Sequence, residues 1–255
     1  MRAGAATMKL ALLADVHANL EALEACLAHA RERGAERFAV LGDVVGYGAD
    51  PGPVVDAVAA LVDAGALAVR GNHDHAAASG DADLMHHAAA RVIAWTRERL
   101  TDGQRAFLAG LPLVVREDGL FLVHASPEAP GAWVYVTDPL RAERAFEAAS
   151  PDPWVFCGHV HEPVLYTRGA AARPVPFRPV PGVAIPVPPR RPWLAVVGSA
   201  GQPRDGNTAA CYAMLDTART TLTFQRVPYD NRAAAEKVRR AGLPETLARR
   251  LERGE

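Results

Sequence analysis

Two histidines stand one residue apart in residues 157–163, which read CGHVHEP. On a strand, residues at this spacing point to the same face, so the rings of His159 and His161 could reach one object. Imidazoles packed together with nothing between them are poorly solvated, and they repel each other once protonated. Most such pairs are ordinary surface residues, so a metal site at this position requires further ligands elsewhere in the chain.

Polar side chains also follow three apolar runs in the first third of the chain, each with the pattern of a buried strand. The runs are residues 9–15, 37–43 and 66–74, which contain Asp15, Asp43 and Asn72. Helical patterns separate these runs, so the order β-α-β-α-β predicts parallel strands joined by right-handed crossovers. Ligands of open parallel sheets bind beyond the carboxyl ends of the strands, and the three side chains are therefore expected to converge on one rim.

The rest of the chain is predicted to alternate helices and strands. Helical patterns cover residues 19–34, 50–65, 82–110, 138–149, 230–241 and 244–252, and strand patterns cover 162–168, 192–201, 209–216 and 221–229. The step Asp118-Gly119 between two apolar stretches is typical of a hairpin with a type I′ turn. The sequence shows no repeat and no convincing boundary, so residues 8–255 are predicted to form one domain behind a flexible leader of residues 1–7.

The composition indicates a globular protein without a strong charge preference. Hydrophobic residues make up 49% and charged residues 22% of the chain, and the formal net charge is −1. Such a charge gives no overall attraction to nucleic acid or to an anionic membrane, and no apolar run approaches the roughly 18 residues of a membrane span. The three cysteines lack C-x-x-C spacing, which argues against a disulfide framework and for a reducing, cytoplasmic location.

Residues 174–192 contain eight prolines. A polyproline ligand for a partner protein is one interpretation of this segment. The favoured interpretation is an irregular edge segment, because proline cannot donate a hydrogen bond inside a central strand.

Five short motifs now stand in order at the predicted strand ends. They are DVH (15–17), GDVVGYG (42–48), GNHD (71–74), VHAS (123–126) and GHVH (158–161). In this order they resemble the calcineurin-like metallophosphoesterase superfamily, and GYGADP at 46–51 resembles its bacterial branch of small members. The resemblance implies an α/β fold, a four-layer α-β-β-α sandwich of two mixed sheets, with the trailing strands in the second sheet.

The resemblance also implies two divalent metal ions. One would be held by Asp15, His17, Asp43 and His161, and the other by Asp43, Asn72, His124 and His159. Carboxylate and imidazole ligands without thiolate suit Mn²⁺, the first choice, and also Fe or Zn²⁺. On this assignment Asp43 bridges the two cations, and the two histidines of CGHVHEP share a strand face because each serves a different metal.

His73 adjoins a ligand and, by the same resemblance, faces the substrate as a proton donor to the leaving oxygen or a stabiliser of phosphoryl charge. Asp74 would fix the tautomer of His73, cap a helix, or do both. A hydroxide between the two metals would attack phosphorus in line. Tyr47, His75 and Arg204 are candidate substrate contacts. Arg204 lies in GSAGQPRDGN (198–207), which resembles a loop of the same branch but has two valines in place of its Asn-Pro.

The function implied is hydrolysis of a phosphate monoester or diester, with a small nucleotide-like substrate favoured. A non-catalytic metal-binding scaffold would be favoured by a missing ligand, and none is missing. A nuclease is disfavoured by the near-neutral charge and by the lack of a basic stretch interleaved with aromatic residues. A phosphoprotein phosphatase is disfavoured because GDVVGYG replaces the GDxVDRG of that branch and removes its arginine. A homo-oligomer is left open.

Overall fold

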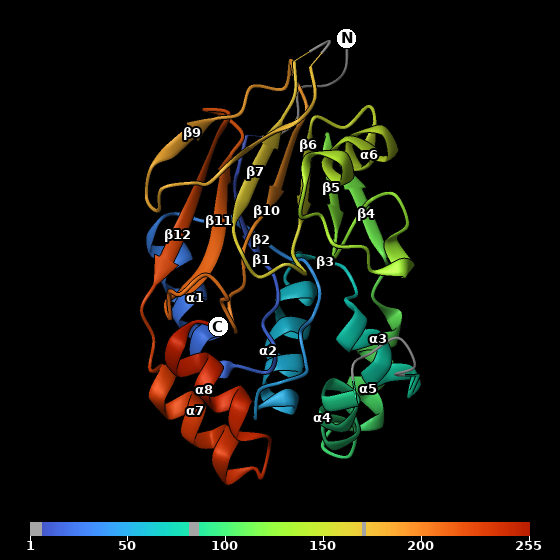
Figure 1. Ribbon diagram of the computed structural model, residues 1–255, viewed down its shortest axis with the longest axis vertical. Coiled ribbons are helices and arrows are strands. Elements are labelled where there is room, and N and C mark those ends of the chain that lie inside the picture. Colours follow the sequence, from blue (N-terminus) through green and yellow to red (C-terminus); the bar gives the residue numbers. More distant parts are fainter. Residues whose placement is uncertain (1–6, 82–86, 170–171) are drawn as a thin grey trace.

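Two six-stranded sheets form the centre of the protein (Figure 1). The computed structural model describes residues 7–81, 87–169 and 172–255, and the statements below concern these ranges. Residues 1–6 of the expected leader and residues 82–86 of the helical pattern at 82–110 lie outside them. The strand order is β3-β2-β1-β11-β12-β9 in the first sheet and β4-β5-β6-β10-β7-β8 in the second.

The predicted β-α-β-α-β unit is confirmed in the first sheet. Strands β1 (Lys9–Leu13), β2 (Arg37–Val40) and β3 (Leu67–Ala68) are parallel, and helices α1 (Leu20–Glu32) and α2 (Pro51–Asp63) connect them. Helix α1 begins at Leu20 because the Oδ1 atom of Asn19 accepts a hydrogen bond from the Ala22 N–H at 3.2 Å. The carboxyl ends of the three strands therefore share one rim.

Strands from the last third of the chain complete the first sheet. They are β11 (Ala210–Asp216), β12 (Thr221–Val227) and the edge strand β9 (Ala184–Pro186), and all pair antiparallel. The expectation that the trailing strands belong to the second sheet is therefore wrong for β11 and β12. The first six residues of β11 are buried without alternation, so this strand needs cover on both faces and lies between β1 and β12.

The second sheet is also mixed. Its strands are β4 (Val114–Glu117), β5 (Leu120–Val123), β6 (Trp154–Cys157), β7 (Val164–Thr167), β8 (Val175–Phe177) and β10 (Trp193–Val196). The β5–β6 and β6–β10 pairs are parallel and the others are antiparallel. The predicted β4–β5 hairpin is confirmed, with the positive φ angles of a type I′ turn at Asp118 (49°) and Gly119 (83°).

Successive side chains of a strand point to opposite faces of the sheet, so they belong to different layers of the core. Leu10 and Leu12 of β1 pack between the two sheets, whereas Ala11 and Leu13 face the cluster that includes α1 and α2. Helix α6 (Pro139–Ala149) covers the outer face of the second sheet through residues such as Phe146. The predicted four-layer α-β-β-α sandwich is therefore confirmed.

The proline-rich segment supplies an edge strand to each sheet. Strand β8 pairs with β7 at the edge of the second sheet, and β9 pairs with β12 at the edge of the first. Both strands are outermost in their sheets, as the favoured interpretation of residues 174–192 predicts.

The remaining helices gather at the end of the sandwich where β1 and β2 end (Figure 1). They are α3 (Asn72–Ser79), α4 (His87–Arg97), α5 (Asp102–Gly110), α7 (Asn231–Arg240) and α8 (Glu245–Arg253), with a short 3-10 turn η1 (Pro130–Ala132) in the loop before α6. None of the helices in the described ranges has the length and apolar character of a membrane span.

Candidate metal centre

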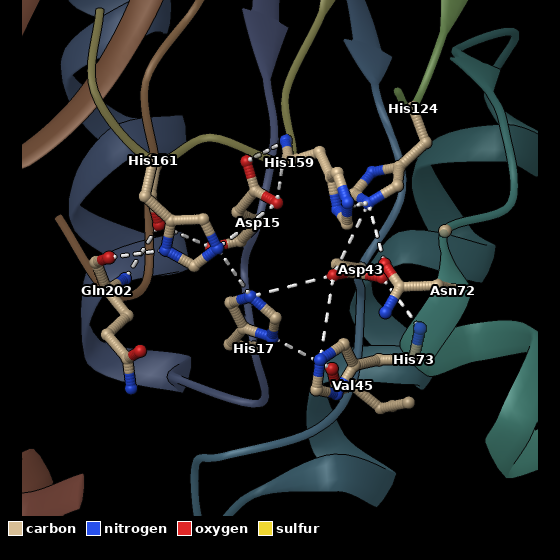
Figure 2. A network of polar contacts seen from close by, with 12 residues as sticks. Asp15, His17, Asp43, Val45, Asn72, His73, His124, His159, His161 and Gln202 are labelled. Carbon is tan, nitrogen blue, oxygen red and sulfur yellow. Dashed lines mark hydrogen bonds and ion pairs between the residues drawn. The ribbon is translucent and has the colours of Figure 1, made fainter. Parts of the chain in front are cut away.

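The seven residues predicted as metal ligands lie together where strands of both sheets end (Figure 2). Asp15 and His17 follow β1, Asp43 follows β2, Asn72 begins α3, His124 follows β5, and His159 and His161 follow β6. The six acidic and histidine side chains are all buried, with at most 6% of their surface exposed. Both sheets thus contribute donor groups to a single buried site.

Asp43 occupies the middle of this group (Figure 2). Its Oδ2 atom lies 3.7 Å from Nε2 of His17 and 3.4 Å from Nε2 of His124. Its Oδ1 atom accepts the backbone N–H of His73 at 2.9 Å, which fixes the carboxylate. One oxygen is therefore anchored, and the other lies between imidazoles from different sheets.

The donor atoms around Asp43 form three overlapping sets, and in each set the atoms lie within 4.8 Å of one another. The first set is Asp15, His17 and His161, the second is Asp43, His124 and His159, and a third joins Asp43 to His17 and His73. Within the second set, Nδ1 of His159 lies 3.0 Å from Nε2 of His124, and the Oδ1 atom of Asn72, 3.1 Å from the same nitrogen, extends this set.

Backbone carbonyls fix the ring orientation of three of these histidines. Nδ1 of His17 contacts the Val45 carbonyl at 3.1 Å, Nδ1 of His124 contacts that of Leu41 at 2.8 Å, and Nδ1 of His161 contacts that of Gln202 at 2.6 Å. A carbonyl can only accept a hydrogen bond, so Nδ1 carries a proton in each ring, and a ring that is neutral presents its Nε2 lone pair.

The two rings of the first set then face each other with their lone pairs. Nε2 of His17 lies 3.1 Å from Nε2 of His161, and neither nitrogen has a proton to share in the neutral rings. A cation between such atoms removes the repulsion, and imidazole with carboxylate is a donor set that divalent transition metals prefer. The residues present therefore fit a metal ion.

The backbone is strained at the same residues. Asp15, His17, Asp43, His159 and His161 have φ angles of 53°, 50°, 52°, 69° and 68°. Left-handed φ angles cost non-glycine residues of order 1–3 kcal/mol each, and they persist where the surrounding structure holds them for function. Nearby glycines allow the close packing that this requires, since a Cβ atom on Gly158 would lie 2.6 Å from Oδ2 of Asp15.

Burial and neighbouring charges set the protonation of the site. Burial holds the pKa values of His17 and His161 well below the usual histidine range, so both rings are neutral. Burial would raise the pKa of Asp43, but the charge and the hydrogen bond of His124 hold it well below its usual range. Burial raises the pKa of Asp15 to about 7, and the Asp43 charge, acting against burial, raises that of His124 to about 9.

The family model of the calcineurin-like phosphoesterase superfamily domain matches residues 8–220. The chain belongs to the calcineurin-like phosphoesterase superfamily. It is 32% identical over 247 residues to an uncharacterized protein of Methanocaldococcus jannaschii, across 95% of this chain and 96% of that protein. The resemblance carried by the five motifs is therefore confirmed, and the family together with its His/Asp clusters indicates a phosphoesterase that binds divalent metal.

Solved structures agree with this family. The crystal structure of a metallophosphoesterase from Sphaerobacter thermophilus superposes with a TM-score of 0.87 at 33% identity, covering 98% of this chain and all of that one. A hypothetical protein from Pyrococcus horikoshii OT3 has the same fold, with a TM-score of 0.77 at 21% identity and coverage of 97% and 98%.

His73 of this phosphoesterase shares a donor set with His17 and Asp43 but differs from the other histidines of the site. Its Nε2 atom is 4.0 Å from Oδ2 of Asp43, farther than the corresponding atoms of His17 and His124. Its Nδ1 atom is buried without a hydrogen-bond partner, so no carbonyl orients the ring as in the three histidines above. Burial lowers the pKa of His73, so the ring of the ligand-free protein is neutral at neutral pH.

Asp74 serves as a helix cap. Its two oxygens accept the backbone N–H groups of Val45 at 3.1 Å and Gly71 at 2.9 Å, at the start of α3. The carboxylate thus joins the Gly71 turn to the loop after β2. Of the two roles predicted for Asp74, these contacts support helix capping, because one of its oxygens accepts the N–H of Gly71, the residue that precedes α3. Both hydrogen bonds described for the Asp74 carboxylate go to backbone N–H groups and not to the His73 ring.

The candidate substrate contacts lie on two sides of the metal centre. Tyr47 packs against His17 and His73, with ring centroids 4.6 Å and 4.5 Å apart, and the guanidinium carbon of Arg204 lies 5.6 Å from the centroid of Tyr47. His75 lines a cavity of about 310 Å³ on the other side, together with Asn72 and His159.

Two aromatic residues of that cavity were not predicted. The Tyr135 ring stacks on His159, with centroids 3.9 Å apart and planes 22° apart, and the Trp133 ring lies 6.0 Å from His124. Both belong to the loop between β5 and α6, where none of the five motifs falls. The only signal in the sequence is the aromatic pair itself, which a surface loop seldom carries without a binding role.

Proposed function

We propose that the protein is a phosphoesterase with two metal ions that hydrolyses a monoester or diester of a small, nucleotide-like compound. The observation that carries this proposal is the position of Asp43 Oδ2, between His17 at 3.7 Å and His124 at 3.4 Å. A carboxylate oxygen placed between two donor sets suits a ligand shared by two cations.

The donor sets support a group of four ligands for each cation. The first would be held by Asp15, His17, Asp43 and His161, and the second by Asp43, Asn72, His124 and His159. Mn²⁺ is the first choice, because the set mixes carboxylate, amide and imidazole without sulfur. When bound, the cations supply an activated water as nucleophile and neutralise charge on the phosphoryl oxygens.

His73 is the protein's own candidate for proton transfer. Its ring lies within 4.0 Å of the Asp43 carboxylate but is left without an orienting carbonyl, so a substrate oxygen can become its partner. A bound phosphoryl dianion beside the ring would raise the pKa of His73 and favour the protonated form. In that form the ring donates its proton to the leaving oxygen.

The aromatic cavity supports a small substrate with a planar group. A volume of about 310 Å³ is near the lower end for small-molecule sites. Trp133, Tyr135 and His75 present ring faces beside Asn72 and His159, and such rings stack on a nucleobase. A phosphate at the metal centre would place its ester substituent close to these rings.

Activity of metal-reconstituted protein against a panel of esters tests this proposal. We expect turnover of nucleotide monoesters or diesters with Mn²⁺, two metal ions per chain by elemental analysis, and little turnover of phosphopeptides or DNA. Two bound ions without turnover of any ester would favour the metal-binding scaffold. Full turnover after exhaustive dialysis against EDTA would overturn the metal-dependent mechanism.

A further inference from the structure

A second cavity, of about 170 Å³, lies next to the metal centre on the far side of Tyr47. Helix α4 and helix α8 form its walls, with Val92 and Leu247 as apolar lining. Its polar lining comes from Arg204, Thr246 and Arg250. The cavity is therefore a small pocket that is lined by two arginines.

Neither arginine has an ion-pair partner among the residues that the structure describes. Within the described ranges, no carboxylate lies within salt-bridge distance of Arg204 or Arg250, and both side chains are half-buried. Nη2 of Arg204 donates to Oε1 of Gln202 at 3.0 Å, while its Nε is buried without a partner. Two partly desolvated cations without a counter-charge are unfavourable, so the pocket is suited to an anion.

Two carboxylates near Tyr47 are paired with a lysine. Nζ of Lys237 lies 2.6 Å from Glu21 and 2.8 Å from Asp50, and both acids line a cavity that Tyr47 and Leu247 also line. These two acids therefore form their ion pairs with Lys237 and not with Arg204 or Arg250.

The pocket is connected to the metal centre through Tyr47. The Tyr47 ring lies 4.5 Å from His73 on one side and 5.6 Å from the Arg204 guanidinium carbon on the other, measured from its centroid. An extended anion could therefore span both places.

We propose that Arg204 and Arg250 form a second anion subsite, which binds a phosphate group of the substrate other than the one that is hydrolysed. This inference rests on the proposed function and narrows it to nucleotides with at least two phosphate groups, such as nucleoside 3′,5′-bisphosphates, in which water cleaves the ester of one phosphate while the subsite holds the other. Guanidinium groups match phosphate oxygens with two parallel hydrogen bonds, which a lysine does not provide. The C-terminal helix α8 thereby becomes part of the substrate site.

Binding of inorganic pyrophosphate to the metal-free protein tests the subsite without catalysis. Isothermal titration calorimetry should show binding to the wild type that weakens roughly tenfold or more in Arg250→Gln and in Arg204→Gln, as expected for a lost charged hydrogen bond. Arg249→Gln is the matched control on the same helix, because Arg249 is exposed and pairs with Glu245 at 3.4 Å. Equal binding by all four proteins would overturn the subsite.

Kinetics with the manganese-loaded enzyme give the second readout. Arg250→Gln should raise the KM for adenosine 3′,5′-bisphosphate roughly tenfold and change the KM for adenosine monophosphate by no more than about twofold. An equal rise for both nucleotides would overturn the subsite, since only the bisphosphate carries a second phosphate. If the wild type hydrolyses no phosphoester, the proposed function fails, and pyrophosphate binding still decides the subsite.

Discussion

Nε2 of His17 and Nε2 of His161 point at each other across 3.1 Å, while the Nδ1 atom of each ring is held by a backbone carbonyl. The protein therefore holds two lone pairs together before any ligand arrives, and a cation between them should stabilise the fold. Mn²⁺ at a hundredfold excess over its Kd should raise the Tm of EDTA-treated protein by about 5–10 °C in differential scanning calorimetry. An unchanged Tm with saturating metal would contradict this expectation.

Asp43→Asn should lower metal content and turnover together. The substitution keeps the shape of the side chain but removes the negative charge between His17 and His124. The loss of metal affinity should exceed the roughly 10–100-fold seen when a residue that only supports a ligand is replaced. Elemental analysis and initial rates are the measurements, and Asp56→Asn on the exposed face of α2 is the control. Full metal occupancy in Asp43→Asn would show that Asp43 is not shared.

His73→Ala should separate catalysis from metal binding. Within its donor set the His73 ring lies farther from the Asp43 carboxylate than His17 does, and it has no orienting carbonyl, so its removal should leave near-full metal content and slow turnover by roughly 10²–10⁴, the range for a lost general acid. The loss should be smaller for a p-nitrophenyl ester, whose leaving group needs no protonation. A loss that is equal for good and poor leaving groups would assign charge stabilisation to His73 in place of proton donation.

Gly46→Ala should slow turnover by displacing His73. A Cβ atom at this position would collide with Nδ1 of His73, and the φ angle of +91° adds backbone strain. Gly65→Ala is a matched control, because its φ angle is +96° and nothing lies within 4 Å of the added Cβ. Both variants should lose about 1–2 kcal/mol of unfolding free energy. Only Gly46→Ala should lower kcat, and similar kcat values in the two variants would show that the His73 ring position is not critical.

Metal affinity should rise with pH between about 6 and 9. Burial raises the pKa of Asp15 to about 7, and the charge of Asp43, acting against burial, raises that of His124 to about 9. Both groups hold protons in the metal-free protein at neutral pH, and a cation must displace them. Affinity should therefore increase up to roughly tenfold per pH unit for each proton released. Calorimetric titration with Mn²⁺ in buffers of different ionisation enthalpy measures that release, and a pH-independent Kd would refute it.

The convergence of the predicted ligand residues could be predicted because each of them follows a strand in a short motif. Asp15, Asp43 and Asn72 converge as the β-α-β-α-β order requires, and the parallel β5–β6 pair brings His124 beside His159. Local sequence therefore determines this part of the site.

Other parts depend on packing that no short pattern records. Strand β11 joins β1 because both of its faces are buried, which the motifs, ending at residue 161, could not show. Arg250 reaches the site only because α8 packs beside Tyr47, and Trp133 reaches it only through the path of its loop. Tertiary arrangement, and not local spacing, decides the residues that surround the substrate.

The edge strands from the proline-rich segment also limit how copies of the protein can associate. Strand β8 contains Pro176 and strand β9 contains Pro186, and each strand is the last of its sheet. Proline has no N–H to offer to an incoming strand, so neither edge presents a complete row of donors. At these two edges a strand of a second copy cannot form a regular β-ladder with the sheet. Self-association at these edges therefore has to use side-chain contacts.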